Sequence, residues 1–168
     1  MISASLRLRL ELSEALAGSP HGLGARVVLA IHQEPGAQAI SGFGQVFPRA
    51  GLSLDILALA KSGSAPGSYY ILTCGCAFHE CARVNESIDV RHTGSSIVWH
   101  IPGGDAGYHV DATILAFCRT AYRDEIARLV ALLHTTRPAS ILCFHTSFES
   151  VLASIKSAID GGAVGTPR

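Results

Sequence analysis

The chain has 168 residues, a length that is most simply one domain able to bury about 70% of the surface its unfolded form exposes. Thirteen basic residues balance thirteen acidic ones, with no basic stripe of the kind that neutralises phosphates, which argues against nucleic acid as a partner. No apolar run approaches the roughly 18 residues that a membrane-spanning helix needs, so no membrane contact is expected.

Two strands and a short helix are expected in the first part of the chain. The leucines of Leu6–Leu12 alternate with charged residues, a period of two that is typical of a strand with one wet face. The run Arg26–His32 is apolar and β-branched, which predicts a second strand. Residues 33–51 are rich in glycine and proline and form a long connection. Ser53 is expected to cap a short helix, Leu54–Lys61.

Further strands are expected in the middle of the chain. Tyr69–Thr73 has the composition of a buried strand. Ile88–His92 and Ile97–Ile101 predict a hairpin, and Trp99 falls on the apolar face of its second strand. Tyr108–Phe117 predicts one more strand.

The end of the chain is expected to be helical. Apolar residues of Tyr122–Leu133 recur at helical spacing, and Asp124 and Arg128 are placed to form an ion pair one turn apart. Thr146 and Glu149 form a capping box for a last helix.

These elements predict an α+β fold: a mostly antiparallel sheet of five or six strands with two or three helices packed on one face. Residues 1–162 are expected to form a single domain and residues 163–168 a disordered tail. We find no internal repeat.

The surface is expected to carry little charge. Charged residues make up 15% of the chain, against about 25% in an average domain, and the mean hydropathy is +0.33. A sizeable exposed apolar patch is therefore expected, and such patches usually mark an interface. A homo-oligomer, most simply a dimer, is the economical interpretation, and another protein partner stays open.

The most informative stretch is Cys74–Cys81 (CGCAFHEC), which holds three of the five cysteines and a histidine. Thiolates this close can clamp a soft metal, form a strained disulfide or act as a redox pair. Without an export signal, an odd number of cysteines is best interpreted as reduced thiols in the cytoplasm.

Zinc is the metal that this cluster favours, because zinc sites prefer four Cys or His ligands in a tetrahedral array. Cys74 and Cys76 are expected at the end of a strand, with a flexible glycine between them, and Cys81 closes the loop. The fourth ligand would be one of three histidines: His79 from inside the loop, or His92 or His100 from the hairpin that follows.

Two other interpretations of the thiols stay open. Reduced thiols can simply pack as small hydrophobes at a strand end. A redox centre usually has a C-x-x-C motif at a helix start, and Cys74-Gly75-Cys76 lacks that spacing. Cys118 and Cys143 lie within apolar runs and are expected in the core.

The region around the cluster resembles a group of known sequences. Tyr70–Cys76, then Cys81, then Val90-x-His92 and Val98-Trp99 are similar to a set of small uncharacterised bacterial proteins. These share a Thr-Cys-x-Cys cluster, a third cysteine and a V-x-V-x-H … V-x-W hairpin. The resemblance covers about residues 69–101 and implies a bacterial, cytosolic protein, without a mechanism.

Two functions follow from these residues. One is a non-enzymatic binding or interaction module with a zinc knuckle at residues 74–81. The alternative is a thiol- or metal-dependent enzyme that uses Cys74, Cys76 or Cys81 with a nearby histidine as base. A catalytic zinc keeps one position open for water, whereas a four-ligand site is closed. The module is favoured, because no carboxylate–histidine pairing accompanies the thiols at motif spacing, and no catalytic residue is identified.

Overall fold

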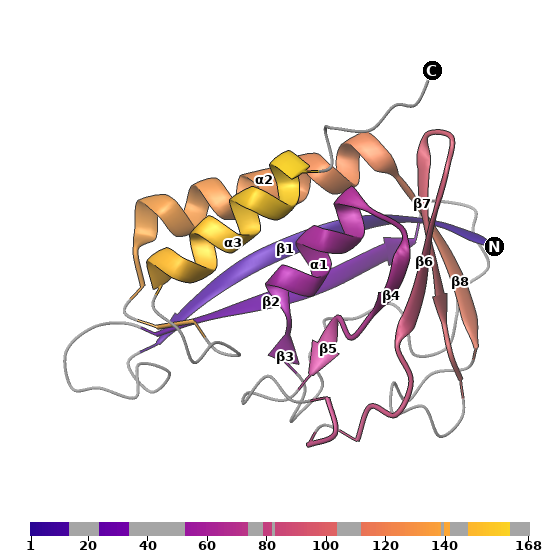
Figure 1. Cartoon of the computed structure of the whole chain (residues 1–168), viewed down its shortest axis with the longest axis horizontal. Helices are drawn as coiled ribbons and strands as arrows, with labels where there is room; N and C mark the ends of the chain where they lie inside the picture. Colours follow the sequence, from indigo (N-terminus) through magenta and orange to yellow (C-terminus); the bar gives the residue numbers. More distant parts are fainter. Residues whose placement is uncertain are drawn as a thin grey trace.

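The computed structural model describes residues 1–13, 24–33, 53–73, 79–81, 83–103, 112–138, 140–141 and 148–161. Seven strands of this part of the chain form one sheet in the order β4-β6-β7-β8-β1-β2-β9, and β3 pairs with β5 in a small second sheet (Figure 1). The elements in chain order are β1 (Ile2–Ser13), β2 (Gly24–Gln33), β3 (Ser53–Leu54), α1 (Ile56–Ser64), β4 (Gly67–Tyr69), β5 (Leu72–Thr73), β6 (Ile88–Thr93), β7 (Ser96–Ile101), β8 (Thr113–Cys118), α2 (Arg119–Thr136), β9 (Ser140–Ile141) and α3 (Phe148–Gly161).

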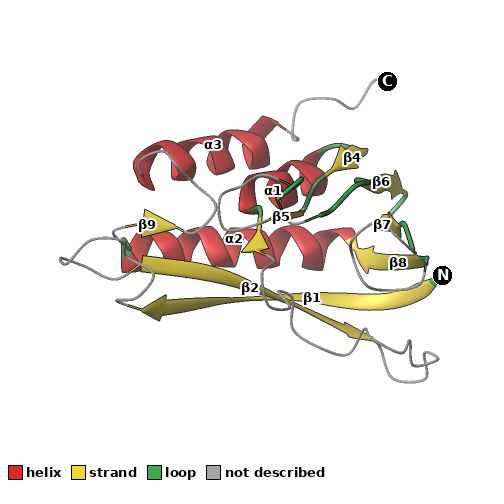
Figure 2. Ribbon diagram, turned by 90° about the horizontal axis from the view of Figure 1, so that it is seen from below, coloured by secondary structure: helices red, strands yellow, loops and turns green. Residues whose placement is uncertain are grey.

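The architecture is a mixed, mostly antiparallel sheet with helices over it. Only the β1–β8 and β2–β9 pairs of the main sheet are parallel among the described strands. The three helices lie on the same side of the long β1–β2 ribbon (Figures 1 and 2). The predicted α+β class is confirmed. The main sheet has seven strands rather than five or six, and the strand that no expected strand covers is β9, which has two residues. The predicted tail, 163–168, lies outside the described residues.

The long ribbon follows the predicted alternation. Leu6 and Leu8 of β1 are buried, and Leu8 lies opposite the buried Leu29 of β2. Arg7 and Arg9 point to the other face and are exposed. The burial fades toward the end of β1, where Leu12 is 40% exposed. The alternation of leucine with charged residues therefore predicted both the strand and its buried face, as expected for a sheet that is covered on one side.

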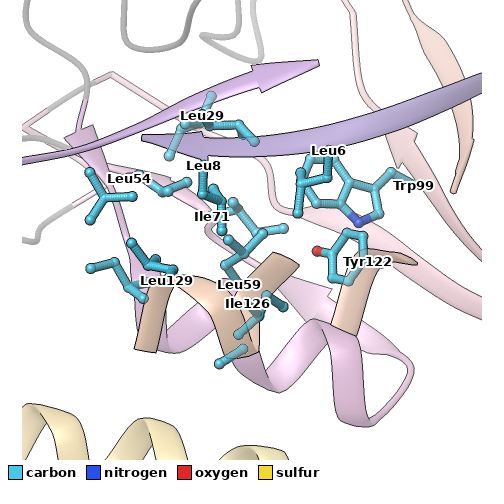
Figure 3. Packing of buried hydrophobic residues seen from close by; sticks show 14 of the residues in the cluster. Leu6, Leu8, Leu29, Leu54, Leu59, Ile71, Trp99, Tyr122, Ile126 and Leu129 are labelled. Carbon is cyan, nitrogen blue, oxygen red and sulfur yellow. The ribbon is translucent and has the colours of Figure 1, made fainter. Parts of the chain in front are cut away.

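The predicted hairpin is also confirmed. β6 and β7 pair antiparallel with Val90 opposite Trp99, and Gly94 adopts a positive φ of 53° in the turn. Such a φ suits glycine, which has no Cβ to clash with the backbone. The ring of Trp99 points into the core beside Tyr122 of α2 (Figure 3).

Two local predictions are wrong. Asp55, and not Ser53, is the N-cap of α1, and its carboxylate accepts a hydrogen bond from the Ala58 N–H at 2.9 Å. Ser53 and Leu54 instead form β3, which pairs with β5. The helix also continues beyond Lys61 to Ser64.

The expected strand Tyr69–Thr73 is divided between two sheets. Gly67–Tyr69 pairs with β6, and Leu72–Thr73 pairs with β3. Tyr70 lies between them outside both ladders, and its ring stacks on His79. Of the strand expected at 108–117, residues 113–117 belong to β8, Ala112 precedes the strand, and residues 108–111 lie outside the described residues.

Close packing of α1 on α2 depends on Gly63. A Cβ at this position would lie 3.2 Å from Ile126 Cδ1 and 3.3 Å from Tyr122 Cε1, and both side chains are buried. Overpacking costs about 1–3 kcal/mol, against a gain of about 0.5–1 kcal/mol from the better helix propensity of alanine. We expect Gly63→Ala to lower the free energy of unfolding by about 1 kcal/mol, measured by urea denaturation.

The matched background is Ile126→Val, which removes the Cδ1 atom nearest to the new methyl group. In that background Gly63→Ala should be close to neutral. An equal loss in both backgrounds would mean that the contact with Ile126 does not explain the effect.

Candidate functional site

Two of the four predicted zinc ligands lie within the described residues and two lie outside them. Cys74 and Cys76 lie outside them, whereas His79 and Cys81 lie within. Thr73 is the last described residue before residues 74–78, and it is buried. The chain therefore enters the candidate site from a buried strand end, as the sequence predicts.

His79 to Val84 form a tight turn. The Val84 N–H donates to the His79 carbonyl at 3.0 Å, and the Arg83 N–H donates to the Glu80 carbonyl at 3.0 Å. Arg83 has a φ of 55°. This combination of a 6→1 bond, a 5→2 bond and a left-handed residue is the Schellman pattern. Val84 is fully buried, so the turn is attached to the core at its end.

The His79 ring is held in three ways. It stacks on Tyr70 with the ring centroids 3.5 Å apart and the planes 9° from parallel. Its Nδ1 lies 3.0 Å from the Val84 carbonyl oxygen. Since a carbonyl only accepts, Nδ1 carries the hydrogen in this bond. Nε2 lies 3.3 Å from a carboxylate oxygen of Glu80, whose side chain is 73% exposed.

This arrangement is the one that a metal-binding histidine commonly has. Such a histidine donates one ring N–H to a carbonyl or carboxylate, which fixes the tautomer and leaves the other nitrogen for the metal. In His79 that other nitrogen is Nε2, and its neighbour Glu80 is exposed enough to turn away. Cys81, two residues on, has an exposed free thiol. Among the residues that the structure describes, no three His, Cys, Asp or Glu side chains come together as a metal site.

The other two histidine candidates lie on the hairpin. His92 lies at the end of β6 that is next to the hairpin turn, and its Nε2 lies 2.8 Å from the Ser62 carbonyl of α1. His92 therefore holds the hairpin against the last turn of α1. His100 is half-buried, lies opposite Asp89 and points to the sheet face away from Trp99. Of the three histidines, His79 is the one that lies within the candidate loop, and its Nδ1 is bonded to the Val84 carbonyl.

Cys118 is not in the core, contrary to the prediction. It is the last residue of β8 and is exposed, because it points away from the face that buries Phe117. An apolar run in a strand with one wet face places every second residue outside. Cys143 lies outside the described residues.

The sequence interpretation missed Glu125, a buried acidic residue on α2 that is 4% exposed. Its Oε1 accepts the Leu8 N–H at 2.6 Å, and its Oε2 accepts the Arg128 Nε–H at 2.8 Å. Arg128 also donates to the Leu8 carbonyl. The predicted pair of Asp124 with Arg128 is therefore replaced by Glu125 with Arg128.

A signal for Glu125 is present in the sequence. It lies three residues after Tyr122 and four before Leu129, which places it on the apolar face of α2. Hydrogen bonding by Arg128 lowers the pKa of the Glu125 carboxyl, against burial, which raises it. The group therefore stays charged and binds the β1 backbone, which makes it a structural residue.

In comparisons with known proteins, the chain matches no protein-family model, no curated protein and no solved structure. No helix of the described ranges is both long and apolar enough to cross a membrane. Function is therefore inferred from the geometry of the His79–Val84 turn and its surroundings.

Proposed function

We propose that the chain is a non-enzymatic binding module whose loop at residues 74–81 is a zinc knuckle. The ligands would be the thiolates of Cys74, Cys76 and Cys81 and the Nε2 atom of His79. The observation that carries this proposal is the hydrogen bond from His79 Nδ1 to the Val84 carbonyl, which leaves Nε2 as the second ring nitrogen. Three thiolates and one imidazole satisfy the tetrahedral preference of zinc.

The rigidity of the turn supports the same proposal. The stack on Tyr70 and the two main-chain bonds hold His79 in place before any metal binds. A pre-formed ligand loses less conformational entropy on binding, so it contributes more to affinity. Cys81 lies on the same turn with an exposed thiol, and deprotonation by a metal would be its ordinary chemistry.

A closed zinc site is favoured over the enzyme alternative. Four protein ligands leave no position for a reacting water. The His92 ring, one candidate base, is hydrogen-bonded to the Ser62 carbonyl of α1. A bacterial, cytosolic location and a relation to the small bacterial proteins with the Thr-Cys-x-Cys cluster belong to the same proposal. Free thiols at Cys81 and Cys118 agree with a cytosolic location.

The test is metal analysis of protein purified without a histidine tag. Wild type is expected to carry about one equivalent of zinc, as a four-ligand site requires. Cys76→Ser and His79→Ala should lose most of it, because each removes one ligand. Cys118→Ser is the matched control, since that exposed thiol lies on β8 and should leave the zinc content unchanged. Wild type with less than about a tenth of an equivalent would contradict the proposal.

Cobalt substitution separates the module from the enzyme. A closed site has no exchangeable water, so azide should leave the visible spectrum of the cobalt protein unchanged. A spectrum that shifts on azide addition would favour an open site and the metal-dependent enzyme.

A further inference from the structure

In the part of the chain that the structure describes, the strand β1 has an edge that its neighbours leave partly open. Its parallel pairing with β8 covers only Ile2–Ala4, because β8 ends at Cys118 and the chain passes directly into α2. Beyond that point α2 runs along β1 (Figure 1). At Leu8 the side chains of Glu125 and Arg128 take the place of a neighbouring strand, since they bind the Leu8 N–H and carbonyl.

The next outward backbone groups belong to Leu10 and Leu12. Peptide groups of a paired strand point alternately to the two sides, and those of Leu8 point away from β2. Those of Leu10 and Leu12 therefore do the same. Within the described part of the chain no hydrogen bond reaches them from this side. Unpaired strand edges of this kind readily accept another strand.

Apolar surface gathers beside the same edge. Leu12 is 40% exposed and Leu132 of α2 is 36% exposed, two of the four large hydrophobic side chains that are exposed in the described residues. Leu132 follows Arg128 by four residues and shares its side of the helix, which faces the β1 edge. Covering Leu12 and Leu132 would add apolar burial to any strand pairing there.

We propose that this edge binds a second copy of the chain through antiparallel pairing of the two β1 strands. The outward backbone groups of Leu8 are already bound by α2. A two-fold pairing must therefore use the outward groups of Leu10 and Leu12, which sets Leu10 opposite Leu12 of the second copy. Glu11 then faces Glu11 of the second copy. This pairing would extend the sheet across two molecules and cover Leu12 and Leu132 on each.

The charges on the outer face fit such a pairing. Arg9 and Glu11 form an ion pair with N and O 2.9 Å apart, and Arg9 is well exposed. In the pairing, each Glu11 would have Arg9 of its own strand beside it and Arg9 of the second copy on the diagonal, within reach of a long side chain. The four charges sum to zero, so the two arginines offset the repulsion between the two glutamates that face each other.

Light scattering across a dilution series is the first test. Wild type is expected to show twice the monomer mass of 17.6 kDa at micromolar concentration. Arg9→Glu would place four acids together and Glu11→Arg four bases, so each single variant should weaken association by at least about tenfold. The double variant Arg9→Glu/Glu11→Arg restores two charges of each sign and should associate like wild type. A wild-type monomer, or a double variant weaker than both singles, would overturn the proposal.

Crosslinking tests the register. Glu11 faces its own copy at a site without hydrogen bonds, where Cα atoms are about 4.5 Å apart, within the range of a disulfide. Glu11→Cys should therefore form an intermolecular disulfide between the introduced cysteines on mild oxidation, identified by peptide mass. Arg9→Cys is equally placed on the outer face but lies far from its own copy in this register. Crosslinking of both variants or of neither would refute the pairing, and wild type oxidised in parallel controls for the native thiols.

Discussion

Trp99→Ala is expected to lower the free energy of unfolding by roughly 3–5 kcal/mol, a large share of the 5–15 kcal/mol typical of a domain. The indole is 1% exposed and packs edge-on against Phe117 at 5.0 Å and Tyr122 at 5.9 Å between ring centroids. These rings come from β7, β8 and α2, and Figure 3 shows those of Trp99 and Tyr122. A cavity here would therefore loosen the sheet from its helical cover.

Urea denaturation followed by circular dichroism is the measurement, because Trp99 is the only tryptophan and its removal also removes the fluorescence signal. His100→Ala is the matched control, since it changes the next residue, which is half-buried on the opposite face. It should unfold near the wild-type midpoint. A wild-type midpoint for Trp99→Ala would show that the ring does not hold this part of the core.

Period-two patterns predicted the strands that carry this core. Leu6 and Leu8, and then Ile97 and Trp99, are buried on the face that the alternation identifies. Such strands have one face against the helices and one face outside, so the core leaves its mark on every second residue. The long helix was predicted from a different period, the helical spacing of about 3.6 residues, and the buried residues of Tyr122–Leu133 follow that spacing.

The errors come from contacts between distant residues. Ser53 and Asp55 are both good caps, and the choice depends on β3 pairing with β5, which joins residues 54 and 72. Tyr70, part of the expected strand, lies outside both strand ladders, and its ring stacks on that of His79, nine residues further along the chain. No local sequence pattern indicates either contact. Secondary-structure propensity alone therefore gave the wrong start for the helix α1 and the wrong extent for the strand at 69–73.

The residues of the candidate site come from the sequence and stay a prediction, whereas the shape of the turn comes from the structure. The spacing of Cys74, Cys76 and Cys81 was visible, whereas the turn at His79–Val84 was not. A Schellman turn is recognised by glycine at its left-handed position, and here that position holds Arg83. The bond from His79 Nδ1 to the Val84 carbonyl, which fixes this ring within the loop, depends on that turn.

Arg128→Ala is expected to cost about 2–4 kcal/mol at neutral pH, because it leaves the buried Glu125 carboxylate without its main partner. The value lies at the lower end for such pairs because Arg128 is 51% exposed and therefore partly hydrated. The Leu8 carbonyl loses a donor as well. Asp124→Ala is the matched control on the same turn, and it should have little effect, because Arg128 pairs with Glu125.

The pH dependence identifies the carboxylate as the cause. Arg128 lowers the pKa of Glu125 by hydrogen bonding, and the Leu8 N–H and Arg7 lower it further, against the opposing effect of burial. A carboxyl whose pKa is lowered by folding adds stability above its ordinary pKa and loses it as the pH falls through the lowered value. Wild type should therefore lose this contribution below about pH 4.

Urea midpoints of wild type and Arg128→Ala should accordingly converge as the pH falls, because a protonated Glu125 no longer attracts Arg128. Wild type loses stability faster in this range than the variant, whose isolated carboxylate is relieved by protonation. A difference that stays constant between about pH 7 and pH 3 would instead mean that Arg128 acts through the packing of its aliphatic stem. Convergence would establish that α2 holds the edge of β1 by charge, at the residue where that edge begins to open.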